Sequence, residues 1–330
     1  MDAGLREFNA AVTAAVETLA AGGDGRALRG DATDLRSVYR SRGDRSAGLA
    51  SALVGRSRAL AYAASRMSST HAAALAVLSS AGTRLTTPPR TVVDLGGGTG
   101  AAAIAAAQTF PDCTVTVIDR SRSALDLGRE IVALLDPSVA PRLTWVEGRM
   151  DAVAHPAELA ILGYSLIEAD DPGAVVRAAL SAAPLVAVIE PGSREGYDNV
   201  LSARDILLAD GRTVVAPCPH DDVCPLRGSR DWCHFGVRTV RTARQMRLKD
   251  GTRDFEDEKF SYVVAGPPSG LSERPESRVI GRPRYGGRLV HLDLCTASGA
   301  ATAATIPKSS PHYPVARRAE WGDALPFAGR

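Results

Sequence analysis

Five short β-rich runs alternate with helical runs between residues 91 and 192, and this alternation restricts the fold more than any other feature. The β-rich runs are TVVDLG, CTVTVID, RLTWVEG, LAILGYS and PLVAVIEPG (91–96, 113–119, 142–148, 159–165 and 184–192). The runs between them, such as GAAAIAAAQTF and SRSALDLGREIVALL, are typical of helices. Such alternation indicates an α/β fold, in which parallel strands are joined by crossover helices on both faces of the sheet.

The flanking segments extend this α/β core. Residues 1–81 carry apolar residues at helical spacing, while KFSYVVAG (259–266) and RLVHLDLC (288–295) predict two further strands. We therefore expect a Rossmann-like, seven-stranded sheet with an N-terminal helical region and a Cys-rich insertion between strands five and six. The predicted regions are a helical region, a nucleotide-binding core, a Cys- and Arg-rich insertion, and two last strands with a tail (1–87, 88–215, 216–258 and 259–330).

The start of the chain predicts the compartment. No apolar run approaches the roughly 18 residues expected of a membrane-spanning helix. The first twenty residues carry Asp2, Glu7 and Glu17, whereas secretory and mitochondrial leaders are usually basic and poor in acids. We therefore expect a soluble cytoplasmic monomer that makes no membrane contact.

The glycine-rich run VVDLGGGTG predicts a nucleotide site, because it joins a strand to a helix start. Its glycines allow a tight turn and a close approach of the backbone to a ligand. A dinucleotide's pyrophosphate would be repelled by Asp94, whereas an ammonium group would be attracted. Asp119 ends the next β-rich run, where it can accept hydrogen bonds from ribose hydroxyls. S-adenosylmethionine carries both groups, and the run resembles motif I of class I methyltransferases.

That resemblance implies a set of cofactor-binding residues but no catalytic one. The adenine is expected at EGRMDA (147–152), and the methyl acceptor at GYSLIEADD (163–171), where we find no general base and no nucleophilic thiol. Glu190 either faces the same cleft or caps a helix. The cofactor-binding residues are Asp94, Gly96, Gly97, Gly98, Gly100, Asp119, Arg120, Met150 and Tyr164.

The stretch APCPHDDVCPLRGSRDWCHF (216–235) holds three of the five cysteines, spaced C-x5-C-x8-C, and Cys295 lies further on. Thiols stay reduced in the cytosol, so ligation is favoured over disulfides. Structural zinc sites usually contain a tight C-x2-C knuckle, whereas looser loops suit an iron–sulfur cluster. The spacing leaves zinc, iron–sulfur and unligated thiols open. His220 and His234 are alternative ligands, and Cys113 is expected to be a buried apolar residue.

Several segments together resemble one family over residues 35–325. APCPHDDVCPL, DWCHFGVR, DFEDEKFSYV, LDLC and the terminal WGD follow AYAASRM, VVDLGGGTG and IEPGSREGY in the family's order. They are similar to the methyltransferase-like family associated with the mitochondrial small ribosomal subunit, and to its bacterial relatives. The resemblance implies an S-adenosylmethionine pocket, a role on small-subunit ribosomal RNA, and a 4Fe-4S cluster on four cysteines (Cys218, Cys224, Cys233 and Cys295).

A basic stretch follows the third cysteine. Although the net charge is only +2, residues 227–253 hold eight Arg and Lys against two acids. Arginines recur every third residue, and on a helix this spacing would align them on one face. Such a row predicts salt-dependent contacts to RNA phosphates, and the alternative is a solvated surface. The residues are Arg238, Arg241, Arg244, Arg247 and Lys249, extended by Arg282, Arg284, Arg288 and Lys308.

Three functions are consistent with these patterns. The first is an S-adenosylmethionine-dependent methyltransferase that acts on small-subunit ribosomal RNA. The second is a ribosome-assembly factor that keeps the pocket and catalyses nothing. The third is a nicotinamide oxidoreductase with a cluster, which requires a dinucleotide at the glycine turn.

Overall fold

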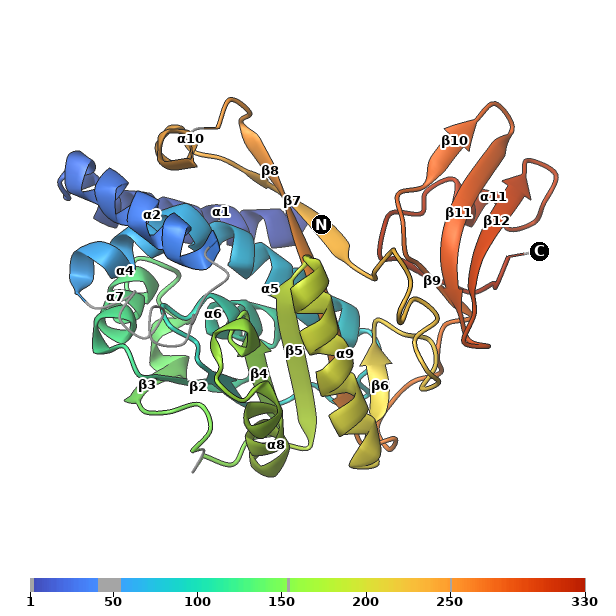
Figure 1. Ribbon diagram of the computed structural model, residues 1–330, viewed down its shortest axis with the longest axis horizontal. Helices are drawn as coiled ribbons and strands as arrows, with labels where there is room; N and C mark the ends of the chain where they lie inside the picture. Colours follow the sequence, from blue (N-terminus) through green and yellow to red (C-terminus); the bar gives the residue numbers. More distant parts are fainter. Residues whose placement is uncertain (1–2, 41–54, 153–154, 250, 330) are drawn as a thin grey trace.

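The computed structural model describes residues 3–40, 55–152, 155–249 and 251–329, and its centre is a mainly parallel sheet (Figure 1). The strand order is β3-β2-β1-β4-β5-β8-β6, and β7 pairs with β8 outside this path. The five strands from β3 to β5 are parallel, while β8 is antiparallel to β5, β6 and β7. The bounds are β1 Thr91–Leu95, β2 Thr114–Asp119, β3 Leu143–Glu147, β4 Leu159–Gly163, β5 Leu185–Pro191, β6 Thr213–Ala216, β7 Phe235–Val240 and β8 Phe255–Gly266.

Helices cover both faces of this sheet, as the alternation predicts. Because successive strand residues point to opposite faces, Val92 packs in the core beneath α6 and α7, whereas Val93 packs beneath α8 and α9. Three of these helices begin at a residue whose side chain accepts a backbone N–H of the first turn. These caps are Ser121, Asp171 and Ser193. The helices are α6 Ala101–Thr109, α7 Arg122–Val132, α8 Pro172–Ala182 and α9 Arg194–Ala209.

The N-terminal helices lie over the α6 face and share its core (Figure 1). A five-residue π-helical turn, Ala63–Met67, interrupts one continuous helical rod and shifts the side chains after it around the axis. The helices are α1 Ala3–Ala21, α2 Gly25–Arg40, α4 Arg56–Tyr62 and α5 Ser68–Gly82. The predicted helical region is confirmed in these ranges, and its part at 41–54 lies outside the described residues. No described helix is long and apolar enough to cross a membrane.

A second, antiparallel sheet follows β8, and it corrects the prediction for 288–295. That run is β11, and it pairs with β9, β10 and β12 instead of ending the central sheet. Val290, Leu292 and Leu294 alternate with more exposed residues, which is typical of an antiparallel strand buried on one face. Both edges of β8 are already paired, so the central sheet has no place for β11 beside it. The C-terminal elements are β9 Ser277–Val279, β10 Arg284–Gly286, β11 Leu289–Thr296, β12 Ala301–Pro307, α11 Tyr313–Ala316 and β13 Ala324–Leu325.

The segment between β5 and β8 also differs from the prediction. The sequence reading missed α9, β6 and β7, and the central sheet has eight strands instead of seven. The cysteine-rich stretch is a loop, residues 217–234, between β6 and β7. A short helix, α10 (Ala243–Lys249), then leads to β8.

We expect Gly128 in α7 to tolerate no side chain. A Cβ there would lie 2.3 Å from a ring carbon of Trp145 and 3.0 Å from the Thr99 carbonyl oxygen. Gly128→Ala should therefore lower the free energy of unfolding by about 1–3 kcal/mol, as overpacking does. The control is Gly30→Ala in α2, where no atom lies within 4 Å. This change should raise stability by about 0.5–1 kcal/mol. Urea unfolding of both variants checks the difference in sign.

Candidate cofactor pocket and cysteine cavity

The glycine turn between β1 and α6 is held by its own hydrogen bonds. The backbone N–H groups of Gly96 and Gly97 donate to the Ile118 carbonyl oxygen at 2.8 and 3.2 Å, and Gly98 N–H donates to Asp119 Oδ2 at 2.9 Å. These three N–H groups are therefore engaged within the protein and not available to a pyrophosphate. This arrangement speaks against the nicotinamide alternative.

Asp94 combines a capping role with a free oxygen. Its Oδ2 accepts from the Ala103 N–H at 3.0 Å, so this oxygen caps the first turn of α6. Its Oδ1 is buried without a hydrogen-bond partner among the described residues. Burial, with a smaller contribution from nearby Asp119, raises the pKa of Asp94 to about 7. A cationic ligand in the cavity would satisfy Oδ1 and favour the ionised form.

Two neighbouring cavities bring the predicted cofactor residues together. The first is lined by Asp94, Gly96, Gly97, Gly98, Asp119 and Tyr164. The second shares Gly96 and Asp119 with it and adds Arg120 and Met150. A Cβ on Gly96 would lie 3.2 Å from Met150 Sδ, so the methionine lies directly against the turn. Gly100 lines neither cavity and instead begins α6 with a φ of 82° beside Trp145.

The N-terminal helices contribute pocket residues that the sequence reading did not identify. Tyr62 and Thr70 line the first cavity from α4 and α5. Neither the glycine spacing nor the strand pattern carries a signal for these residues, because they meet the turn only through tertiary packing.

Tyr164 connects the pocket to β8. It adopts a φ of 58°, which is unusual for a residue with a side chain. Its hydroxyl donates to Glu258 Oε1 at 3.1 Å, and Arg66 of the π-helical turn donates to the same oxygen at 2.8 Å. Burial and the Glu258 carboxylate raise the pKa of Tyr164 well above its usual value. The phenol is therefore held as a neutral donor.

Glu190 has a structural role. It is fully buried, and its two carboxylate oxygens accept the N–H groups of Leu166 and Ile167 at 3.0 and 3.1 Å. Burial raises the pKa of Glu190 to about 8. It fixes the loop after β4 and lines neither cavity.

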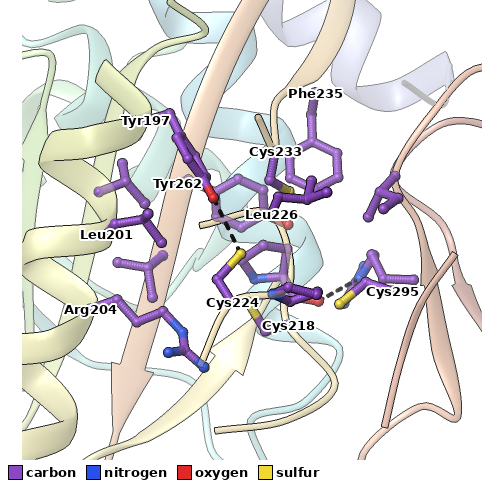
Figure 2. A pocket seen from close by; sticks show the side chains of 16 residues that line it. Tyr197, Leu201, Arg204, Cys218, Cys224, Leu226, Cys233, Phe235, Tyr262 and Cys295 are labelled. Carbon is purple, nitrogen blue, oxygen red and sulfur yellow. Dashed lines mark hydrogen bonds between the residues drawn. The ribbon is translucent and has the colours of Figure 1, made fainter. Parts of the chain in front are cut away.

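Four of the five cysteines line one cavity (Figure 2). Cys218, Cys224 and Cys233 come from the loop between β6 and β7, and Cys295 comes from β11 in the second sheet. Tyr197 of α9 contacts Cys224, with its hydroxyl 3.3 Å from the Sγ. The fifth cysteine, Cys113, is buried in the main core, as predicted.

Histidine takes part in this cavity through a hydrogen bond. His220 Nε2 lies 3.3 Å from Cys295 Sγ, and burial lowers the pKa of the imidazole. His234 lies between aromatic rings, with its ring centroid 5.5 Å from that of Trp232 and 5.0 Å from that of Trp321.

Two buried arginines border the thiols. Arg204 donates to the backbone carbonyls of His220 and Asp222, and Arg278 donates to those of Pro217 and Gly322. Neither guanidinium pairs with a carboxylate of the described residues. Burial raises the pKa of Cys218, and the positive charges of Arg204 and Arg278 oppose this shift.

Burial is also the main cause of the pKa shifts of the other thiols. It raises the pKa of Cys295 to about 12, with the neighbouring Cys218 and Cys224 adding to the shift, and raises that of Cys233 well above its usual value. Among the described residues, no group of three or more His, Cys, Asp or Glu side chains could hold a metal ion.

The predicted arginine row is not one helical face. Arg238 lies on β7 and makes two hydrogen bonds with Asp257, at 2.7 and 2.9 Å, while only the residues from 243 onward are helical. Arg241 and Lys249 pair with Glu256, and Arg244 pairs with Glu17 at 3.0 Å. The predicted row of cations is therefore largely neutralised, because acids from β8 and α1 pair with it. Arg247 alone among the five is exposed without a carboxylate partner in the described chain.

A comparison with known proteins gives the family. The family described as "Mitochondrial small ribosomal subunit Rsm22" matches residues 56–326. The chain belongs to the Rsm22 family. Two mitochondrial Rsm22-cox11 tandem proteins of Schizosaccharomyces pombe are each 24% identical to it, over 44% of this chain and 25% of theirs. This Rsm22-family chain thus matches about a quarter of the length of those relatives.

Solved methyltransferase structures are also similar. A precorrin-6y C5,15-methyltransferase from Geobacter metallireducens is 15% identical, with a TM-score of 0.39, over 60% of this chain and 86% of that one. The plantazolicin methyltransferase BpumL, solved with SAH, is 10% identical, with a TM-score of 0.38, over 74% and 97%. Because these TM-scores are low, the fold of the Rsm22-family protein is assigned from its own strand order.

The raised pKa of Asp94 predicts a pH effect on stability. In the folded protein the Asp94 carboxyl stays protonated up to about pH 7, whereas in the unfolded chain it ionises near its ordinary pKa of 3.8. Stability from this group therefore falls as pH rises between these values. Between pH 5 and pH 8, the ligand-free wild type should lose about 2–3 kcal/mol more than Asp94→Asn. Glu190 is present in both proteins, so its contribution cancels. Urea unfolding at the two pH values tests this, and parallel pH profiles would contradict it.

Proposed function

We propose that this Rsm22-family protein binds S-adenosylmethionine and acts as a methyltransferase on small-subunit ribosomal RNA, or in assembly of that subunit. The observation that carries the proposal is the pair of carboxylates on either side of the glycine turn. Both Asp94 and Asp119 line the cavity, and Asp94 Oδ1 has no hydrogen-bond partner among the described residues. The family description supplies the link to the small ribosomal subunit.

Each pocket residue has a part in holding the ligand. Asp94 Oδ1 would accept from the ammonium group, and Asp119 would accept from the ribose hydroxyls. Met150 and the Arg149–Asp151 ion pair, in which Arg149 Nη2 lies 2.6 Å from Asp151 Oδ2, would border the adenine. The bound cofactor would supply a methyl group on a positively charged sulfur. Tyr62 and Thr70 would close the pocket from the N-terminal helices and exclude water.

A non-catalytic assembly factor is the second candidate, and the acceptor loop favours it. Both carboxylate oxygens of Glu190 accept hydrogen bonds from the backbone of that loop, and the Tyr164 hydroxyl donates to Glu258. Two groups that would otherwise serve as a base or a donor toward a methyl acceptor are thus held by the protein itself.

We further propose that the four cysteines of the cavity hold a 4Fe-4S cluster. A four-iron cube is wider than one ion, so its ligands need not converge on a single point. Four thiolates on such a cube leave a negative charge, which the guanidiniums of Arg204 and Arg278 would balance. Without an anionic centre, these two buried cations face only neutral thiols and carbonyls. The cluster would be structural, because four cysteine ligands leave no open position.

The cofactor proposal is tested with radiolabelled S-adenosylmethionine. Asp94→Asn should weaken binding roughly 10- to 100-fold, because a charge-assisted hydrogen bond is lost. Asp126→Asn, an exposed carboxylate on α7, is the matched control and should bind normally. Equal affinity of both variants would contradict the pocket assignment. Methyl transfer to precursor small subunits then decides between the candidates, since binding without transfer favours the assembly factor.

The cluster proposal is tested by a matched pair of cysteine variants purified without oxygen. Cys295→Ala should lose bound iron and sulfide together with the absorbance near 400 nm. Cys113→Ala removes a thiol from the main core and should keep all three. Iron and sulfide analysis provides the measurement. A wild-type protein without sulfide, or a Cys295→Ala protein with as much iron and sulfide as the wild type, would rule the cluster out.

A further inference from the structure

The end of the C-terminal sheet gathers cations from three segments. Here the β10–β11 turn meets the chain that follows β12, since the Lys308 N–H donates to the Arg288 carbonyl oxygen at 2.8 Å. The segment after α11 lies against the same place, because the Arg317 guanidinium lies 4.6 Å from the ring centroid of Tyr285. We name this tip cluster by five residues: Tyr285, Arg288, Lys308, Arg317 and Arg318.

The charge of the tip cluster is not neutralised. Its four cations are exposed, and none pairs with a carboxylate within the described ranges. Neighbouring arginines behave differently, because Arg282 pairs with Asp257 and Arg284 with Asp293. The row at 238–249 is also largely paired. Among the described residues, the tip cluster therefore carries more unpaired positive charge than the row at 238–249 does.

Planar and apolar groups lie among these cations. Tyr285 is 49% exposed although its hydroxyl donates to the Ala319 carbonyl oxygen at 3.1 Å, so the ring is fixed at the surface. Leu289 at the start of β11 and Val315 in α11 are each 38% exposed. A ring fixed beneath a guanidinium, on a part of the fold that also carries unpaired cations, is a combination suited to stacking an unpaired base and holding its phosphates.

We propose that the tip cluster is a contact surface for single-stranded RNA. Arg288, Lys308 and Arg318 bind phosphates, and the Tyr285–Arg317 pair stacks a base. The inference rests on the proposed function for its partner, the RNA of the small subunit. It differs from the sequence-based prediction by moving the contact from the paired row at 238–249 to the second sheet.

The first test is a charge-matched pair of triple variants. Arg288→Gln, Lys308→Gln and Arg318→Gln are combined in one protein. Arg56→Gln, Arg122→Gln and Arg177→Gln, which are exposed arginines paired with exposed acids, form the control. Binding of a fluorescent mixed-sequence single-stranded RNA is measured across salt concentrations. The tip variant should lower the slope of log affinity against log salt by about 2, and the control should leave it nearly unchanged. Equal slopes would overturn the proposal.

The second test separates stacking from charge. Tyr285→Ala should weaken RNA binding roughly 5- to 100-fold, whereas Tyr285→Phe keeps the ring and should bind as the wild type does. Binding of the wild type to vesicles of anionic phospholipid, with no binding to RNA, would overturn the proposal in favour of a membrane surface. Radiolabelled S-adenosylmethionine binding is measured on every variant. A wild-type protein that binds no S-adenosylmethionine would count against the proposed function. Tip variants that bind RNA as tightly as the wild type would count against the tip cluster alone.

Discussion

The buried guanidinium of Arg278 joins the two sheets of this protein. From β9 it donates to the Pro217 carbonyl at the start of the cysteine loop, to the Gly322 carbonyl near the C-terminus, and to Ser80 of α5. It is only 5% exposed, so losing any of these acceptors would leave a buried donor unsatisfied. The placement of Cys295 opposite the three loop cysteines depends on this connection, because β9 and β11 are paired at Arg278 and Cys295.

The charge of that guanidinium also gives the cysteine cavity its electrostatic character. Arg204 enters from α9 and Arg278 from β9, and each uses carbonyl oxygens as acceptors. Carbonyl dipoles stabilise a buried cation less than a full negative charge does. The positive charges of Arg204 and Arg278 oppose the rise in pKa that burial causes at Cys218 and Cys295, but burial is the larger effect. The proposed 4Fe-4S cluster would supply the negative charge that these two buried cations do not find in the protein.

The sequence predicted those features that local chemistry determines. The glycine turn, Asp94 and Asp119 lie within thirty residues of one another, and their roles follow from strand ends and a helix start. The arginine row failed because its partners, Glu17 and Glu256, belong to other elements. Periodicity also misplaced β11, although its alternating pattern already indicated an antiparallel strand. The convergence of the cysteines was predicted by the family resemblance and not by their spacing.

The cysteine cavity and the cofactor pocket are connected through one hairpin. Ser261 of β8 donates to the Cys233 carbonyl at 2.8 Å, immediately before β7 begins. Three residues toward the N-terminus on β8, Glu258 accepts from Tyr164 and Arg66 beside the pocket. Because β7 and β8 are paired in continuous register from Phe235 to Val240, the strand that follows the cysteine loop lies directly beside the segment that carries Glu258. The contact of Ser261 with the cysteine loop and the contacts of Glu258 with Tyr164 and Arg66 are thus carried by one strand, β8.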